Sequence, residues 1–272
     1  MELETLTLAV ADHVATVTLC RGAQLNTMNA AFWDEMPRVF AAIDADPSVR
    51  AVVIASTGKH FSAGLDLGWA GQSLTGHAGD AGRAREAFLR HVKRLQQTFN
   101  VIDRARMPVI AAVQGGCIGA GVDLVTACDL RVGTADCFFT VQEINVGIVA
   151  DVGTLQRLPY LLPQGLVREL AYTGRRFGGP EAKGHGFLNY LEPDAEAAQA
   201  RAHALATEIA TKSPLALMGI KHVLNHGRGA TVEAGLDYVA LWNAAMLQGD
   251  DMPAAVGAQL RKEGATFADL LP

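Results

Sequence analysis

One stretch decides the fold: VIAAVQGGCIGAGVD, residues 109–123. Its first five residues are apolar and predict a buried strand, its glycines predict a turn, and a helix is expected from about Gly121 to Cys128. A strand, a glycine turn and a helix in this order bring backbone N–H groups together at the positive end of the helix dipole. Such a place can hold either a phosphate or the oxygen of a developing enolate.

The glycine spacing bears on which of these two ligands fits. A dinucleotide-binding turn needs Gly-x-Gly-x-x-Gly, whereas this turn has the reversed order Gly116-x-x-Gly119-x-Gly121, without a following Gly-Lys-Ser/Thr. Glu143 does lie about 20 residues downstream, like the ribose-binding acid of a dinucleotide fold, so that interpretation stays open. The oxyanion interpretation fits better, because a helix that opens at Ala120 can direct its N–H at a carbonyl oxygen.

A second turn of similar character lies at Phe61-Ser62-Ala63-Gly64-Leu65-Asp66. It follows another buried strand, ends in Gly-x-Asp, and can open a helix with Asp66 near its N-terminus. Two such turns can provide two N–H groups that face one carbonyl oxygen. The alternative is that both are only tight turns that pack helices on strands.

Three acidic residues stand in segments dominated by glycine and apolar residues: Asp123, Glu143 and Asp151. Carboxylates in such surroundings are costly unless they are paired, hydrogen-bonded or protonated. Together beside a possible oxyanion site they indicate proton transfer. Structural roles are the alternative: Asp123 could cap its own helix, Asp151 could cap the next one, and Glu143 could pair with Arg131 or Arg157.

The first two thirds of the chain alternate strand and helix patterns, which predicts a layered α/β core. Strands are expected at 6–10, 14–19, 51–55, 109–113, 130–132 and 138–141, and helices at 29–43, 83–104 and 121–128. The first two strands form a hairpin that turns at Asp12-His13, and the strand–helix–strand order that follows predicts a parallel crossover. A loop over 58–68 and a Gly/Ala/Ser stretch over 69–82 are expected, the latter as a mobile lid near the substrate.

Beyond about Pro193 the strand patterns end. Helices are expected at 195–212, 215–224 and 231–248. The sequence therefore predicts a core over residues 1–194 and a helical region over 195–272, whose apolar faces pack on another subunit.

Composition excludes several classes of function. The formal charge is −5 and no polybasic block occurs, which argues against nucleic acid and anionic membranes as partners. No apolar run approaches the length of a membrane span, and the ends show neither a signal segment nor a peroxisomal tripeptide, so a cytoplasmic protein is expected.

The four cysteines lack metal-ligand spacing and are expected to be reduced thiols. His222 and His226 are one helical turn apart but lack a third ligand, so no metal site is expected.

These motifs resemble the crotonase (enoyl-CoA hydratase/isomerase) superfamily over nearly the whole chain. Its markers are residues 61–67, 115–131 and 153–159, and residues 115–129, 150–158 and 238–243 resemble the dienoyl-CoA isomerase branch. The resemblance implies a spiral of β-β-α units with a helical C-terminal trimerisation region, often assembled as a dimer of trimers. It implies an acyl-CoA substrate whose thioester carbonyl accepts N–H bonds from Leu65 and Ala120. CoA is then part of the substrate, and no separate cofactor is expected.

The resemblance also implies residues that contact the CoA part or the thioester. They are Gln24, Leu25, Asn26, Ala63, Gly64, Asp66 and Gly119. The chain departs from the family pattern at Gln24, where alanine is commoner, and at Ala120, where glycine is usual. The Ala120 change keeps the N–H but narrows the space beside it.

The acids distinguish the candidate reactions. Hydratases of the family typically carry glutamate at the position of Asp123 and a small residue at that of Asp151, and they add water with two glutamates. In the dienoyl isomerase pattern, Glu143 exchanges a proton at the α-carbon, Asp151 exchanges one at the ε-carbon, and Asp123 orients the pair. A hydratase or another crotonase reaction, and a non-catalytic acyl-CoA-binding or scaffold protein, are the alternatives.

Overall fold

The computed structural model describes residues 2–73 and 80–271. Within these residues, one sheet has six strands in the order β1-β2-β3-β4-β6-β9, and a second has three in the order β5-β7-β8. The strands of the larger sheet are β1 Leu6–Ala11, β2 Val14–Leu19, β3 Ala51–Ser56, β4 Val109–Val113, β6 Leu130–Thr134 and β9 Tyr190–Glu192. Those of the smaller sheet are β5 Gly116–Ile118, β7 Phe138–Thr140 and β8 Phe177–Gly178.

The predicted hairpin and crossover are confirmed. β1 and β2 pair antiparallel, and the turn between them holds Asp12 and His13 at φ 48° and 64°, as a tight hairpin turn requires. β2, β3, β4, β6 and β9 then pair in parallel. Each parallel step needs a crossover, which places helices over the faces of the sheet.

The long helices begin where the sequence provides caps. The helices are α1 Ala30–Ala45, α2 Leu67–Ser73, α3 Ala81–Arg104, α4 Ala120–Ala127, α5 Thr154–Arg157, α6 Gln164–Thr173, α7 Gly179–Gly184, α8 Ala195–Ala210, α9 Pro214–Gly227, α10 Val232–Met246 and α11 Asp251–Arg261. Three short 3₁₀ segments are η1 Gly22–Gln24, η2 Glu143–Val146 and η3 Leu158–Tyr160. The side chains of Asn29, Asp194 and Thr231 accept N–H bonds at the starts of α1, α8 and α10.

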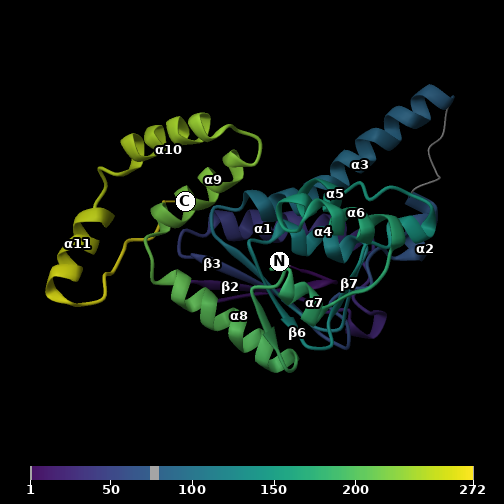
Figure 1. Cartoon of the computed structure of the whole chain (residues 1–272), viewed down its shortest axis with the longest axis horizontal. Coiled ribbons are helices and arrows are strands. Elements are labelled where there is room, and N and C mark those ends of the chain that lie inside the picture. The colour runs from purple at the N-terminus through teal and green to yellow at the C-terminus, as the bar shows by residue number, and fades with distance from the viewer. Residues whose placement is uncertain (1, 74–79, 272) are drawn as a thin grey trace.

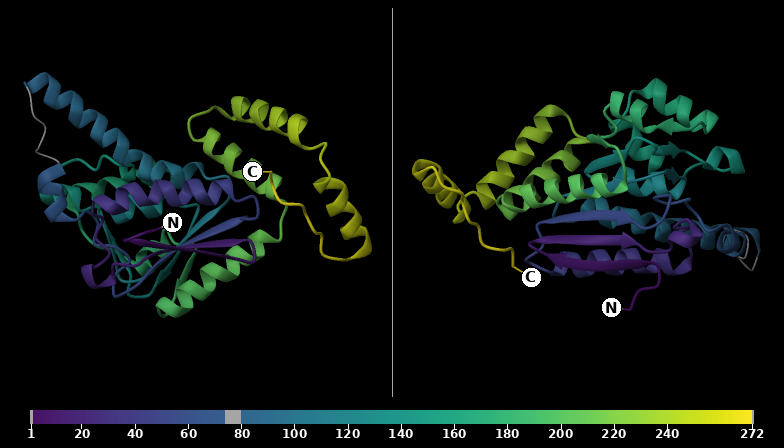
Figure 2. Two further views of the ribbon diagram at one scale, coloured as in Figure 1. Left: turned by 180° about the vertical axis from the view of Figure 1, so that it is seen from behind. Right: turned by 90° about the horizontal axis from the view of Figure 1, so that it is seen from below.

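Helices cover both faces of the large sheet (Figures 1 and 2). α1, α3 and α4 contribute Phe32, Phe99 and Leu124 to the main core on one face. α8 packs on the other face through alanines at every fourth position, Ala198, Ala202, Ala206 and Ala210, which lie against β3, β4 and β6. This small-residue stripe lets the helix approach the sheet closely.

Several elements differ from the sequence-based expectations. α2 occupies positions where a loop was expected, and it begins where Asp66 was considered able to open a helix, because the Asp66 carboxylate accepts the N–H groups of Gly68 and Trp69. β5 lies inside the stretch that was expected to be only a glycine turn. α6, α7, α11, β8 and β9 were not predicted. The expected mobile stretch over 69–82 includes residues 74–79, which lie outside the described residues.

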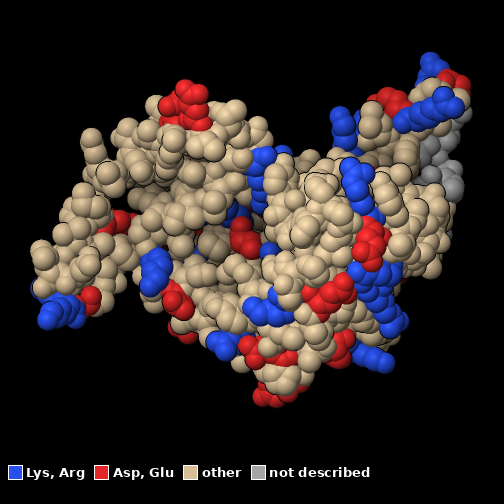
Figure 3. All heavy atoms as spheres, viewed as in Figure 1, with Lys and Arg blue, Asp and Glu red and all other residues tan. Residues whose placement is uncertain are grey.

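Of the helices after α8, α9 contacts the core through buried Lys221, which donates to Ile102 O and Met107 O, whereas α10 and α11 lie away from the sheets (Figure 1). These three helices expose large apolar side chains, among them Leu224, Val232, Leu236, Leu241 and Leu260. Figure 3 shows few charges over most of this region on the face in view. Among the described residues, no helix is long and apolar enough to cross a membrane.

Candidate active site

The two glycine-containing turns lie directly against each other. Ser62 pairs with Cys117 in a short parallel bridge, in which Ser62 N donates to Gly116 O at 3.2 Å and Ile118 N donates to Ser62 O at 3.0 Å. Gly64 has φ 82°, and a Cβ there would lie 2.5 Å from Ile118 O and 3.3 Å from Ala120 N. Glycine at position 64 is therefore what lets the first turn reach the start of α4.

Leu65 and Ala120 present the two N–H groups that the sequence indicated. Neither N–H has a hydrogen-bond acceptor among the residues that the structure describes. Ala120 opens α4, where the first N–H groups have no intrahelical partner. Around Leu65, the Gly64 carbonyl accepts from Met28 N and Asp66 N donates to Met28 O, which fixes the flanking peptides. Both N–H groups are therefore available to an acceptor, as an oxyanion site requires.

The segment predicted to contact CoA is joined to the first turn. Ala63 N donates to Leu25 O at 2.9 Å, and Ser62 Oγ donates to Asn26 O at 2.8 Å. Leu25 and Asn26 have φ 54° and 52°, an uncommon backbone for non-glycine residues, and the Asn26 amide donates to Thr57 O and stabilises it. Gln24 and the Leu25 side chain are exposed beside the turn and free to contact a ligand.

Asp66 and Gly119 mainly position neighbouring parts of the site. The Asp66 carboxylate caps α2, accepts from the Thr27 hydroxyl at 3.2 Å and pairs with Arg21 at 3.7 Å. Burial alone would raise the pKa of Asp66, but these hydrogen bonds and the Arg21 charge lower it. Gly119 has φ 53°, and a Cβ there would lie 3.4 Å from Glu143 Oε1. Gly119 thus places the Glu143 carboxylate next to the start of α4.

Glu143 opens η2 just after β7, rather than standing in a strand. It is half-buried. Burial raises the pKa of Glu143, hydrogen bonds from backbone N–H groups lower it in part, and the negative charge of Asp151 raises it further. The charge of Asp151 thus acts on Glu143, and the charge of Glu143 acts on Asp123. We call Asp123, Glu143 and Asp151 the acid cluster.

Asp123 is completely buried in the first turn of α4. Its Oδ1 accepts the Thr154 N–H at 2.5 Å, so Asp123 holds the start of α5 and does not cap its own helix. Its Oδ2 has no partner among the described residues. Burial and the charge of Glu143 raise the pKa of Asp123 to about 7, against the lowering effects of Thr154 and Arg157.

Asp151 lies at the edge of the cluster and is exposed in the single chain. Partial burial of its carboxyl group still raises its pKa, while its own N–H and His91 lower it. Asp151 does not cap α5, which begins after Gly153. Its carbonyl oxygen accepts from Gln96 Nε2 at 2.8 Å, which ties this segment to α3.

The arginines considered as partners of Glu143 have other partners. Arg131 donates to the carbonyl oxygens of Val125, Cys128 and Phe187. Arg157 pairs with Asp103 and Asn100 on α3.

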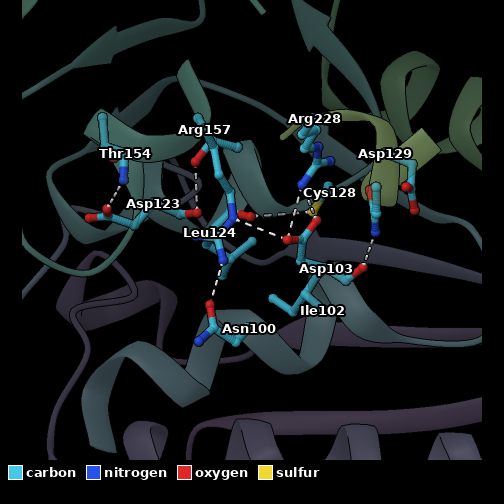
Figure 4. A network of polar contacts seen from close by, with 12 residues as sticks. Asn100, Ile102, Asp103, Asp123, Leu124, Cys128, Asp129, Thr154, Arg157 and Arg228 are labelled. Carbon is cyan, nitrogen blue, oxygen red and sulfur yellow. Dashed lines mark hydrogen bonds and ion pairs between the residues drawn. The ribbon is translucent and has the colours of Figure 1, made fainter. Parts of the chain in front are cut away.

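A polar cavity of about 350 Å³ adjoins Asp151. Arg157, Asn100, Asp103 and Arg228 line part of it, and Figure 4 shows their contacts. None of these four residues was among the site residues expected from the sequence. The only feature of the sequence that pointed to any of them was the position of Arg157 in the family-marker run 153–159.

Among the described residues, no group of three or more His, Cys, Asp or Glu side chains is placed to hold a metal ion. His222 stacks on Trp242 and His226 on Tyr238, with ring centroids 5.2 Å and 4.1 Å apart. The four cysteines are free thiols, as expected, and three are buried.

Solved structures with the same fold place the chain among the crotonases. The chain superposes with a TM-score of 0.89 on a putative enoyl-CoA hydratase from Streptomyces coelicolor A3(2), at 28% identity over 98% of this chain and 95% of that one. It superposes with a TM-score of 0.88 on the enoyl-CoA hydratase from Bacillus anthracis, at 26% identity over 97% and 99%. The expected crotonase-like α/β fold with a helical C-terminal region is confirmed.

Sequence comparison gives the family. The model of the enoyl-CoA hydratase/isomerase family matches residues 10–259, and the chain belongs to this family. It is 48% identical to the mitochondrial Delta(3,5)-Delta(2,4)-dienoyl-CoA isomerase of Homo sapiens, over 90% of this chain and 76% of that protein. It is 42% identical to the peroxisomal Delta(3,5)-Delta(2,4)-dienoyl-CoA isomerase of Arabidopsis thaliana, over 92% and 91%.

Proposed function

We propose that this protein is an isomerase that converts 3,5-dienoyl-CoA into 2,4-dienoyl-CoA. The observation that carries the proposal is the acid cluster beside the free N–H groups of Leu65 and Ala120. The identity to relatives named for this activity supports the same assignment. Two carboxyl groups in addition to buried Asp123 suit a proton shift between two distant carbons, which water addition does not need.

The reaction removes one proton from the acyl chain and adds another at a different carbon. Glu143 removes a proton from the α-carbon of the 3,5-dienoyl thioester, and the electron pair spreads over the acyl chain and the thioester oxygen. The N–H groups of Leu65 and Ala120 stabilise the charge on that oxygen, each by roughly 10²–10³ in rate. Asp151 then gives a proton to the ε-carbon, which leaves double bonds at positions 2 and 4. No electrons are exchanged with a cofactor, so CoA within the substrate suffices.

The reaction needs opposite protonation states on two neighbouring acids. Glu143 must be ionised while Asp151 carries the proton that it donates. The raised pKa values of both groups favour a proton held at this site, because partial burial of each group and the charge of Asp151 near Glu143 disfavour a second ionised carboxylate. Buried Asp123 orients the cluster through its bond to Thr154.

Hydration is the second candidate, since the solved structures at 26–28% identity are named hydratases. A hydratase adds water to a 2-enoyl thioester with two glutamates, whereas this site pairs Glu143 with a shorter buried Asp123 and a third acid. Incorporation of oxygen from labelled water into the product distinguishes the two reactions.

The proposal extends to assembly. The apolar side chains exposed on α9 to α11 support a homotrimer, or a dimer of trimers, formed through the region 195–272. The division of the chain into 1–194 and 195–272, the cytoplasmic location and the mobile lid stay predictions.

The test is ultraviolet absorbance during incubation of the purified protein with a 3,5-dienoyl-CoA. Growth of the absorbance of the conjugated 2,4-dienoyl thioester is the expected result. An unchanged spectrum, with binding of the substrate shown independently, would overturn the isomerase assignment and favour the hydratase.

A further inference from the structure

Arg157 is a buried cation next to the acid cluster that the proposed mechanism does not use. It ends α5 and is 9% exposed. Its Nη2 donates to Asn100 Oδ1 at 2.6 Å, and its Nε lies 3.6 Å from Asp103 Oδ2 (Figure 4). Both partners are on the C-terminal part of α3, where Phe99 and Ile102 are buried, so two residues of one packed segment orient the guanidinium.

The third nitrogen of this guanidinium lies against Gly153. Arg157 Nη1 is buried and has no partner among the described residues. It lies over Gly153, where a Cβ would be only 1.8 Å from Nη1. Gly153 also has φ 139°, a conformation that L side chains rarely adopt. Glycine at position 153 thus lets the guanidinium contact the backbone of this segment.

That backbone connects two members of the acid cluster. Thr154, directly after Gly153, donates its N–H to the Asp123 carboxylate, and Asp151 precedes Gly153 by two residues. Asp123 Oδ2 and Thr154 Oγ1 are also buried without a hydrogen-bond partner in the described chain. Unpaired buried polar atoms at one place are costly and usually indicate a function or a bound water.

We propose that Arg157 is a positioning residue that clamps the segment 151–154 against α3 and so sets the geometry of the acid cluster. The inference rests on the proposed function for the reaction that the cluster performs. Arg157 touches neither the acyl chain nor CoA in this scheme. It acts through Gly153 and Thr154 on Asp123, and through the same segment on Asp151.

Electrostatics supports the clamp. The groups that influence the titration of Asp123 are Glu143 from η2, which raises its pKa, and Thr154 and Arg157 from α5, which lower it. Cys117 of β5 also senses the Asp123 charge, but its own thiol pKa is raised well above the usual value by burial, so it stays neutral. Arg157 is therefore the cation that limits the upward shift of Asp123.

Arg228 offers a matched control. It follows α9 and pairs with the same acid, Asp103, at 2.8 Å and 3.1 Å. Its replacement also removes one positive charge from the polar cavity. None of the three atoms nearest to a Cβ at Gly153 belongs to Arg228, and Arg228 is not among the groups that shift the pKa of Asp123.

The experiment compares Arg157→Gln, Arg157→Lys and Arg228→Gln with the wild-type protein. The pKa of Asp123 is measured by carboxyl ¹³C NMR, with Asp123→Asn to assign the resonance, and kcat and KM are measured with a 3,5-dienoyl-CoA.

For Arg157→Gln we expect the pKa of Asp123 to rise by about one unit. We expect kcat to fall roughly ten- to hundredfold at unchanged KM, since a small misplacement of catalytic groups costs this much. Arg157→Lys should keep the pKa of Asp123 near its wild-type value but recover only part of kcat. A lysine ammonium keeps the charge but cannot reproduce the planar, forked set of N–H donors of a guanidinium. Arg228→Gln should leave both quantities as in the wild type.

Two results would overturn the clamp: an unchanged pKa of Asp123 in folded Arg157→Gln, or the same losses in Arg228→Gln. If Arg157→Gln does not fold, Asn100→Ala removes the 2.6 Å partner and leaves the charge in place. In that variant, kcat should fall while KM is kept, and an unchanged kcat would contradict the proposal. Absence of isomerase activity in the wild-type protein would count against the proposed function alone, because the titration still decides the role of Arg157.

Discussion

The buried carboxylate of Asp123 accepts a 2.5 Å hydrogen bond from the backbone N–H of Thr154, 31 positions later in the chain. This bond joins the helix that starts at the oxyanion turn to the helix that follows Asp151. Asp123 thus links two helices through one carboxylate oxygen. Its buried carboxyl group also has a raised pKa.

The electrostatic consequence is a pH-dependent stability. The pKa of Asp123 is about 7 in the folded chain and about 3.9 when unfolded, so the folded state binds the extra proton between these values. Folding stability should therefore fall as pH rises from about 4 to 7, by up to a few kcal/mol from this group. Asp123→Asn keeps an oxygen that can accept from Thr154 and should lose this slope. Urea unfolding of both proteins at pH 5 and pH 8 measures it, and parallel pH profiles would contradict the expected burial cost.

The two outer acids should separate the two halves of the reaction. Glu143→Gln should lose both isomerisation and exchange of the α-proton with D₂O, by roughly 10²–10⁴ each. Asp151→Asn should lose isomerisation to a similar degree but retain α-proton exchange, because only protonation of the ε-carbon is blocked. Mass spectrometry of the recovered thioester gives the exchange, and acyl-CoA binding is the control for folding. Normal isomerisation by Asp151→Asn would remove Asp151 from the mechanism.

The buried strands of the core could be predicted from the sequence better than the segments around the candidate site. Patterns at 14–19, 51–55 and 109–113 gave the parallel strands, because buried strands are short, apolar and bounded by turns. The resemblance to the crotonase family pointed to the N–H groups of Leu65 and Ala120, and in the structure Gly64 lies against Ala120 N.

What escaped prediction depends on contacts between distant positions. Asp123 was considered as a cap of its own helix, and no local pattern shows that its partner is Thr154. The partners of Arg157 on α3 lie 57 and 54 positions away (157 − 100 and 157 − 103), so spacing along the chain could not reveal them.

Close packing of the two turns predicts a strict requirement at Gly64. Gly64→Ala would place a methyl group 2.5 Å from Ile118 O and strain a backbone with φ 82°. The turns must separate, which moves the N–H of Leu65 away from that of Ala120, and kcat should fall by 10² or more, roughly the effect of losing one oxyanion donor. Gly165→Ala is the matched control, since nothing lies within 4 Å of the added carbon and the residue is in α6. It should retain activity and gain slightly in stability. Equal kcat values for the two variants would argue against the paired N–H site.

The exposed apolar face of the C-terminal helices predicts self-association. Leu236 and Leu241 on α10 are 62% and 71% exposed in the single chain, and no described residue covers them. If a second copy of the chain covers this face, Leu236→Glu should convert the assembly to monomers, because a buried charge without a partner destabilises an interface. Val10→Glu on the edge strand β1 is the control, since Val10 is also apolar and is 44% exposed. Light scattering after size-exclusion chromatography gives the masses. A monomeric wild-type protein, or an unchanged mass for Leu236→Glu, would show that α10 does not form the interface.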